Sequence, residues 1–333
     1  VCTGDSTDIV VTVFAKPNLS NPAKAFSICD STMATLALTS NVAGTTFTWR
    51  AFANSPLVSG YSSQLTPSAL INQRLDNLGF TTQTVTYRIL PSANACAGDS
   101  IDVVYTVFPT ADLANADRTD SICDSTFTNI SLTSHVAGTS FTWRAFGSSP
   151  MVTGYSNSVA PGLTISQRLE NNGTVAQTVT YRLLPAANGC VGDSVDFVVT
   201  VFPTPNLSNT SLTKEICNNN NTGINLTSDV SGTLFTWTCT PSSGFITGYA
   251  NSTVPATSIN QNLVNSGSSN ETVTYHITPA ANGCSGWLYH YVVTVVPSPY
   301  LTNNPLRKTQ CNGVNTNITL LSNVAGTQFT WTA

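Results

Sequence analysis

The sequence predicts an all-β protein, a tandem array of antiparallel β-sandwich modules with a period of 94 residues. Three observations support this prediction. Whole segments recur at one fixed spacing, apolar and polar residues alternate in short runs, and only 8% of the 333 residues are charged. Alternation with a period of two is typical of strands with one buried face, whereas an amphipathic helix repeats about every 3.6 residues.

The repeat is clearest in an aromatic segment and in the cysteines. Residues 41–49 recur at 135–143, 229–237 and 323–331, so the Trp at the end of each copy is 94 residues from the next. Eight of the nine cysteines follow the same spacing in two series, Cys2, Cys96, Cys190 and Cys284, and Cys29, Cys123, Cys217 and Cys311. This period is too long for a solenoid repeat but close to the roughly 100 residues of an immunoglobulin-type sandwich.

Within one period the alternating runs are rich in Thr, Val, Tyr and Phe, which β-strands favour. They lie at residues 36–38, 46–51, 84–89 and 101–107. Gly44 falls between two of these runs, where a tight turn often needs a residue with positive φ. Residues 70–77 are expected to hold at most one helical turn, and no longer helix is predicted.

Each module is expected to end where a strand meets a proline, at Pro109, Pro203 and Pro297. This rule gives complete modules at the ranges 17–110, 111–204 and 205–298. Residues 1–16 match the end of a preceding module, and residues 299–333 match the start of a following one. The two end segments together are too short to complete one sandwich, so we expect a segment of a longer repetitive protein.

The recurring aromatic residues are predicted to form the core of each module. A Trp alternates with a Phe on the same side of its run, which places it on the inner face, like the buried Trp of immunoglobulin domains. The four positions are Trp49, Trp143, Trp237 and Trp331. The alternative is a set of exposed platforms on which sugar rings stack. Tyr87, Tyr181 and Tyr275 are also expected in the core, with each hydroxyl hydrogen-bonded at its edge.

Composition and motifs argue against several classes of function. With 12 Lys and Arg against 16 Asp and Glu, the chain lacks the basic surface that nucleic acids require, and no apolar run is long enough to predict membrane insertion. No catalytic, phosphate-binding or dinucleotide-binding motif predicts an enzyme or a cofactor. No metal site is predicted, because His135, His276 and His290 occupy different positions of the repeat and are expected on the surface. The paired Asp99 and Asp102 offer too few oxygens for calcium.

Several strings resemble the PKD-like repeats of Bacteroidota surface proteins. They are Ile-Cys-Asp-Ser-Thr at 28–32, Phe-Thr-Trp at 47–49, Val-Thr-Tyr at 85–87 and Ala-Asn-Gly-Cys at 187–190. The resemblance extends over all modules of the chain. It implies β-sandwich modules at the cell surface, as in the giant adhesins of gliding motility that type IX secretion exports. It also implies a structural or adhesive role.

The cysteines independently favour an oxidising, extracellular location. Regular spacing without a Cys-x-x-Cys pair is typical of disulfides rather than of zinc sites. Pairing inside a module, Cys29 with Cys96 and Cys123 with Cys190, is the default expectation for secreted domains. Because the two cysteines of a module belong at opposite ends of a sandwich, the alternative pairs Cys29 with Cys190 and Cys123 with Cys284 across the joints between modules.

Cys239, the ninth cysteine, lies outside both series. It takes the place that Ala51 and Ala145 have in the other modules, two residues after the Trp. A free thiol packs as a small apolar group, so we expect Cys239 to be buried and not to act as a nucleophile.

Asp-Ser followed by Thr or an aliphatic residue recurs in predicted turns. This pattern is similar to the O-glycosylation sequon of exported Bacteroidota proteins. The hypothesis is that glycans are attached to Ser6, Ser31, Ser100, Ser121, Ser125 and Ser194. The alternative is turn chemistry, in which Asp accepts hydrogen bonds from nearby backbone N–H groups.

The expected function is a structural rod or stalk, a segment of a long extracellular surface protein such as an adhesin or a filament subunit. Neighbouring modules are its expected partners, with further copies in a filament and surface glycans as other candidates. The alternative function is an array of carbohydrate-binding or ligand-binding modules. Its binding positions would vary between modules and face outward, namely Arg50, Arg144 and Thr238, and Arg88, Arg182 and His276.

Overall fold

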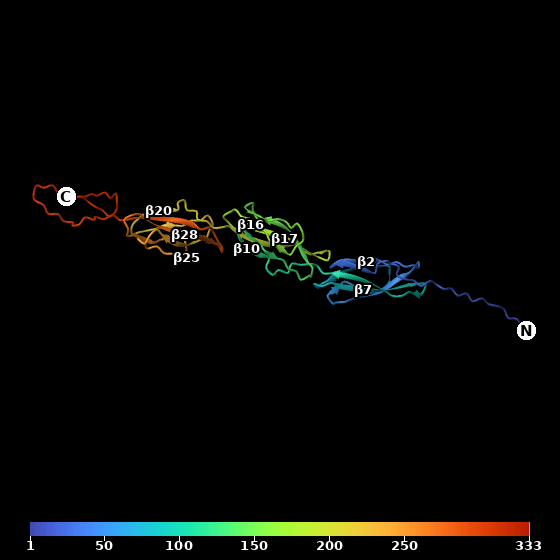
Figure 1. Ribbon diagram of the computed structural model, residues 1–333. Coiled ribbons are helices and arrows are strands. Elements are labelled where there is room, and N and C mark those ends of the chain that lie inside the picture. Colours follow the sequence, from blue (N-terminus) through green and yellow to red (C-terminus); the bar gives the residue numbers. More distant parts are fainter. Residues whose placement is uncertain (333) are drawn as a thin grey trace.

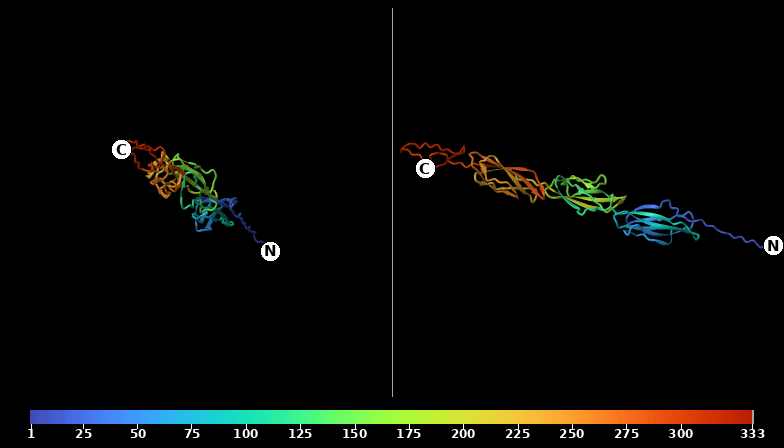
Figure 2. Two further views of the ribbon diagram at one scale, coloured as in Figure 1. Left: turned by 60° about the vertical axis from the view of Figure 1, so that its left-hand side comes forward. Right: turned by 60° about the horizontal axis from the view of Figure 1, so that its bottom comes forward.

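The computed structural model describes residues 1–332, which contain a row of three β-sandwiches (Figure 1). The sandwiches follow one another end to end, and the two termini lie at opposite ends of the row (Figures 1 and 2). We call them modules 1, 2 and 3, with the ranges proposed from the repeat. The described residues contain no helix, and hence none long and apolar enough to cross a membrane.

Module 1 has a large sheet and a small sheet. The large sheet has the order β1-β9-β7-β3-β5 with β8 paired to β7, and the small sheet has the order β2-β6-β4. The strands are β1 (Ala25–Cys29), β2 (Thr32–Ala37), β3 (Thr46–Ala53), β4 (Val58–Ser59), β5 (Gln64–Ser68), β6 (Leu70–Asn77), β7 (Gln83–Ala93), β8 (Cys96–Ala97) and β9 (Ile101–Phe108). The first strand, β1, runs parallel to the last, β9, so both finish at the same end of the module.

Module 2 repeats this plan with a shorter edge. Its sheets have the orders β10-β19-β17-β13, with β18 paired to β17, β11-β16-β14 and β12-β15. The strands are β10 (Thr119–Cys123), β11 (Thr126–Phe127), β12 (Ile130–Ser131), β13 (Ser140–Gly147), β14 (Val152–Thr153), β15 (Thr164–Ile165), β16 (Arg168–Asn171), β17 (Gln177–Ala187), β18 (Cys190–Val191) and β19 (Val195–Phe202). In place of β5 it has a single bridge between Phe141 and Gly162.

Module 3 again has the full large sheet, β20-β30-β28-β23-β25, with β29 paired to β28. Its other strands pair as β21-β27-β24 and β22-β26. The strands are β20 (Thr213–Cys217), β21 (Asn220–Asn221), β22 (Ile224–Asn225), β23 (Leu234–Pro241), β24 (Ile246–Thr247), β25 (Ser252–Ala256), β26 (Ser258–Ile259), β27 (Asn262–Asn265), β28 (Glu271–Ala281), β29 (Cys284–Ser285) and β30 (Tyr289–Val296).

Each module buries its own core between its sheets. Trp49 and Trp237 are 3% and 7% exposed, and both lie in these cores. Trp143 is only half-buried because module 2 lacks the edge strand that covers the equivalent Trp in modules 1 and 3. The recurring Tyr is fully buried in all three modules, and its hydroxyl donates to a Gln side chain at 2.9 Å, as in the pair Tyr87 and Gln73.

Two expectations from the sequence are wrong. Residues 70–77 form the strand β6 and not a helical turn. The buried apolar residues Ile71 and Leu75 are four positions apart, which is also the spacing of a helix. The inward position between them holds the polar Gln73, which accepts a hydrogen bond from Tyr87, so the alternation of a strand is hidden. Trp331 is 77% exposed rather than a core residue, because residues 299–332 include no strands equivalent to those that cover Trp49.

Candidate functional site

The two ends of each module hold the residues that join it to its neighbours. Because β1 and β9 are parallel, Cys29 lies opposite Phe108 at the far end of module 1. Cys96 lies in the hairpin that precedes β9, at the near end. There the hairpin touches the incoming chain, since a Cβ on Gly98 would lie 2.1 Å from the carbonyl oxygen of Pro17. The two cysteines of one module are therefore separated by the length of a sandwich.

Disulfides connect the modules to one another. Cys29 is bonded to Cys190 and Cys123 to Cys284, with the Cα atoms 5.6 Å apart in each bridge. Each bridge links the far end of one module to the near-end hairpin of the next. Pairing inside a module, such as Cys29 with Cys96, is therefore wrong, because those residues lie at opposite ends. Each bridge spans 161 positions, so the two bridges overlap along the sequence.

Five cysteines form no bridge among the described residues, namely Cys2, Cys96, Cys217, Cys239 and Cys311. Two of them stand at the outer ends of the row. Cys96 has the place in module 1 that Cys190 has in module 2, and Cys217 has the place in module 3 that Cys29 has in module 1. The outer ends of modules 1 and 3 thus carry, without a bridge, the same two cysteine positions that are bridged inside the row.

Cys239 is half-buried against the core of module 3. Its thiol donates to the carbonyl oxygen of Ala250 at 3.3 Å. Burial raises its pKa to about 11, which the hydrogen bond only partly offsets. A thiol that stays protonated at neutral pH is a poor nucleophile. Its environment therefore suits a packing residue.

A side-chain carboxylate next to the first cysteine of each bridge binds both the small sheet and the linker. Asp30 accepts hydrogen bonds from the backbone N–H of Asn77 at 2.6 Å and from the Thr110 hydroxyl at 2.9 Å. Asp124 has the same two partners at the second joint, at 2.7 and 3.0 Å. In module 3, Asn218 accepts the equivalent backbone N–H at 2.8 Å. An oxygen acceptor at this position is thus common to all three modules.

The hairpin that carries the second cysteine of each bridge lies directly on the linker. A Cβ built on Gly192 would lie 1.8 Å from the carbonyl oxygen of Ala111, and one on Gly286 would lie 1.9 Å from that of Pro205. Only glycine allows the backbone of the hairpin to come this close. The bridge and the glycine contact together hold the hairpin against the chain that enters the module.

The two joints differ in side chains that meet where the modules touch. At the first joint, Phe80 of module 1 stacks on His135 of module 2 with ring centroids 4.6 Å apart, and Nδ1 of His135 lies 2.6 Å from Oδ2 of Asp112. Partial burial raises the pKa of Asp112, but hydrogen bonds from His135 and a neighbouring Ser outweigh it and hold that pKa below its ordinary value. The second joint has Thr174 and Asp229 at these positions. No sequence pattern predicts this stack, because the two rings meet only where two modules touch.

The proposed glycosylation sites lie at the surface, with one exception. Ser6, Ser31, Ser100, Ser121 and Ser194 are exposed, and Ser125 is half-buried. Ser31 and Ser125 have φ values of 60° and 62°, and Asn219 has 62° at the same position of module 3. Asn and Ser side chains suit such turns, and the Asp before each Ser accepts the joint hydrogen bonds. Structure alone therefore accounts for Asp-Ser at these two turns, and glycosylation stays a hypothesis.

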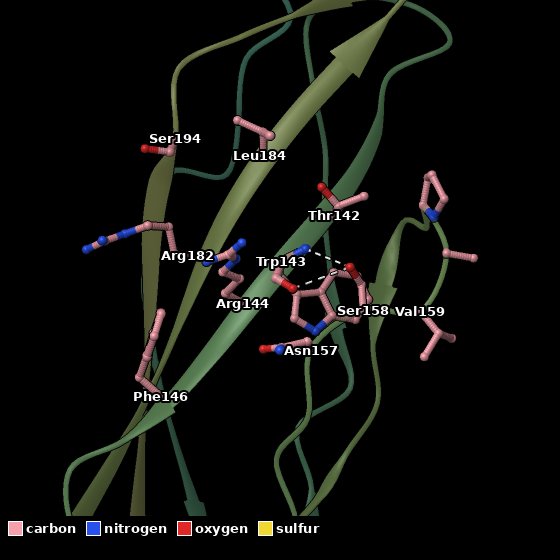
Figure 3. A pocket seen from close by; sticks show the side chains of 12 residues that line it. Thr142, Trp143, Arg144, Phe146, Asn157, Ser158, Val159, Arg182, Leu184 and Ser194 are labelled. Atoms are coloured by element: carbon pink, nitrogen blue, oxygen red, sulfur yellow. Dashed lines mark hydrogen bonds between the residues drawn. The ribbon is translucent and has the colours of Figure 1, made fainter.

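The residues of the ligand-binding alternative line a hollow on the outer face of each large sheet. In module 2, Arg144 and Arg182 are directly opposite on β13 and β17, and the hollow beside them has a volume of about 630 Å³ (Figure 3). Modules 1 and 3 have hollows of about 460 and 500 Å³ in the same place. These are lined by Arg50 and Arg88, and by Thr238 and His276.

An ion pair neutralises one arginine of each hollow in modules 1 and 2. Arg88 donates from Nε and Nη2 to both oxygens of Asp102, each at 2.8 Å, and lies 5.5 Å from the ring centre of Phe52. The hydrogen bond from Arg88 lowers the pKa of Asp102 against a small opposing effect of burial. Arg182 and Asp196 form the same pair in module 2. The other arginine of each hollow, Arg50 or Arg144, forms no salt bridge among the described residues.

Comparisons with known proteins give one matching family model and several distantly similar structures. Residues 26–111, 120–205 and 214–299 match the family model of the PKD-like domain, which together is more than half of the chain. The I-band fragment I67-I69 from titin is 9% identical and covers 86% of this chain and 100% of its own, with a TM-score of 0.40. Human CDH23 EC21-23 is 11% identical and covers 85% and 100%, with a TM-score of 0.35. No curated protein matches the sequence.

Proposed function

We propose that this chain, which belongs to the PKD-like domain family, is a rod segment of a long extracellular surface protein, an adhesin or a filament subunit. Repeats of this kind are typical of structural and adhesive modules rather than of enzymes. The observation that carries the proposal is the pair of overlapping disulfides between consecutive modules. Disulfides persist in oxidising surroundings, which supports an extracellular location.

The overlap of the bridges changes how the chain transmits a pull along its axis. A pull passes from Cys29 to Cys190 through the first bridge, back along the chain to Cys123, and through the second bridge to Cys284. The covalent path from Cys29 to Cys284 then contains the 67 steps along the chain from position 123 to position 190 instead of the 255 from 29 to 284. At about 3.6 Å per extended residue, that is about 240 Å rather than about 900 Å. The bridges would therefore limit the lengthening of the rod even when modules unfold.

Negative-stain electron microscopy of residues 1–333 tests the rod. With the bridges oxidised, we expect straight particles with a narrow distribution of angles between modules. After mild reduction, the same particles should bend more widely, because the hairpins are then held only by contacts with the linkers. A Cys239→Ala variant, which leaves both bridges intact, serves as the control. Equal angle distributions in the oxidised and reduced protein would contradict the proposal.

The proposal extends to partners, export and modification. Its partners are neighbouring modules, which Cys96 and Cys217 are placed to bridge, and further copies in a filament. Resemblance of the repeated strings to Bacteroidota adhesins supports a place at the cell surface after type IX secretion. Exposure of five of the six candidate serines supports O-glycosylation. Intact-mass analysis of the native protein tests this last point, and the mass of the unmodified polypeptide would rule glycans out.

A second candidate function is the binding of anionic groups, such as those of acidic surface glycans, in the outer hollows. Like charges directly opposite one another destabilise a sheet. Arg144 and Arg182 are so placed, and only Arg182 is paired with a carboxylate. A glycan-array screen tests this function with Arg144→Thr, which introduces the residue that module 3 has at this position. Loss of an acidic-glycan signal in the variant supports binding, and an array without any signal contradicts it.

A further inference from the structure

Module 3 replaces three contacting residues of the outer sheet face together. Modules 1 and 2 have Phe, Arg and Asp there, the set in which the Arg pairs with Asp and covers the Phe ring. Module 3 has Thr240, His276 and His290 at the same positions of the repeat. The strand register places His276 on β28 directly opposite His290 on β30. An Arg–Asp ion pair is thus replaced by two imidazoles, and the Phe ring beside it is replaced by a hydroxyl group.

The two imidazoles point the same nitrogen at each other. Their Nδ1 atoms are 2.7 Å apart, and the ring planes are nearly perpendicular, at 89°. The other nitrogen of His276, Nε2, lies 2.8 Å from the hydroxyl oxygen of Thr240. His290 is exposed and His276 is half-buried, so the pair lies at the surface of the sheet.

We propose that His276 and His290 bind a divalent late first-row transition metal through their Nδ1 atoms, with Cu²⁺ bound more tightly than Ni²⁺ or Zn²⁺. Imidazole is a preferred ligand of these ions, and Cu²⁺ has the highest affinity in the series. Metal–nitrogen bonds are about 2.0–2.1 Å long, so two nitrogens at adjacent coordination positions lie about 3 Å apart. The two Nδ1 atoms are 2.7 Å apart at hydrogen-bond distance, close to this value, and on binding both rings turn so that they face one ion instead of each other.

Thr240 supplies the second feature of such a site. A metal-binding His commonly donates its other ring N–H to a nearby oxygen, and this bond fixes the orientation of the ring. The Thr240 hydroxyl is in place to accept that hydrogen bond from Nε2 of His276, which leaves Nδ1 for the metal. The Phe at this position in modules 1 and 2 could not accept it.

The site is open rather than closed. No group of three or more His, Cys, Asp or Glu side chains that could hold a metal occurs in residues 1–332, so the protein supplies two nitrogens at this place. Water completes the coordination and can be exchanged for a ligand from another molecule. A structural zinc site, by contrast, is closed by four protein ligands.

Isothermal titration calorimetry of residues 1–333 with CuCl₂ and ZnCl₂ tests the proposal. The Cys239→Ala form is used with its other free thiols alkylated, so that sulfur cannot bind the metal. We expect one Cu²⁺ per chain, bound at least tenfold more tightly than Zn²⁺. The double variant His276→Arg/His290→Asp, which installs the pair that modules 1 and 2 already fold with, should weaken Cu²⁺ binding at least tenfold.

Matched variants separate this site from other histidines. His135→Asp, which introduces the residue of module 3 at that position, should leave Cu²⁺ binding unchanged. Electron paramagnetic resonance of the Cu²⁺ complex should show two imidazole nitrogens in the parent and one in His290→Asn. An unchanged Cu²⁺ affinity in a folded double variant, as judged by circular dichroism, would overturn the proposal, as would a complex without imidazole nitrogen.

Discussion

The joints and the outer sheet faces of this molecule differ in how closely the modules repeat one another. At both joints the same two cysteine positions are bridged, and Asp30 and Asp124 accept hydrogen bonds from equivalent partners. On the outer faces, one position of the repeat holds Arg88 in module 1 but His276 in module 3. A bridged cysteine contacts two modules, so its replacement must suit both, whereas a residue on the face is bounded by solvent on one side. The difference indicates that the joints build the rod and that the faces give single modules their own chemistry.

Removing a bridge should have the largest effect. In Cys29→Ser/Cys190→Ser the first joint loses a covalent link that closes a loop of 161 positions, for which chain entropy gives about 5 kcal/mol. Guanidinium unfolding, followed by a probe in modules 1 and 2, measures the loss. Cys239→Ala is the matched control and should change stability little. Equal stability of the double variant and the control would show that the bridge does not stabilise the joint.

Gly192→Ala tests the contact between hairpin and linker without touching a disulfide. The added Cβ would lie 1.8 Å from the carbonyl oxygen of Ala111, so the hairpin must shift, at a cost of about 1–3 kcal/mol. Thermal unfolding of the variant beside the parent measures this loss of stability. Gly162→Ala is the control, because nothing lies within 4 Å of its added Cβ. If both variants unfold at the same temperature, the close approach is unimportant.

Asp124→Ala should cost about 1–2 kcal/mol, because the backbone N–H of Asn171 and the hydroxyl of Thr204 lose their acceptor. Asp124→Asn should retain most of the stability, since Asn218 accepts the equivalent N–H in module 3. Chemical unfolding of the two variants side by side measures the difference. If Asn is as harmful as Ala, the joints depend on the negative charge and are less alike than the geometry indicates.

The smallest effect should be a difference in acid sensitivity between the two joints. The pKa of Asp112 is lower in the folded protein than its ordinary value of about 3.9, so its contribution is complete above that pH and is lost as the pH falls through the folded-state pKa. The second joint has Asn206 at the equivalent position, and an Asn side chain does not titrate. Thermal unfolding at pH 7 and pH 3 should show a smaller shift for Asp112→Asn than for the parent. An equal shift would remove Asp112 from the account.

Most of the fold could be predicted because each module repeats simple local patterns. Strict alternation placed the strands around Trp49 and Tyr87, and the 94-residue period divided the chain into modules. The strand β6 was missed because Gln73 occupies an inward position, where its side chain accepts a hydrogen bond from the Tyr87 hydroxyl. A polar residue that is satisfied by one buried partner cannot be recognised from the pattern of polarity alone.

The candidate sites depend on contacts that no local pattern records. Cys29 and Cys96 lie at opposite ends of module 1 because β1 pairs parallel to β9. Only the structure showed which cysteine of the next module lies beside Cys29. His276 and His290 are 14 positions apart, and the register of β28 against β30 brings them together. A residue such as Phe80 meets its partner only across a joint.

Single-molecule force spectroscopy with handles at the two ends of residues 1–333 tests the central claim, that overlapping bridges carry the pull between modules. In oxidising buffer, the stretch between Cys29 and Cys284 should extend to about 240 Å, the length of 67 residues. With a reductant present, the same stretch should extend to about 900 Å, close to four times further. A full extension in oxidising buffer would contradict the account.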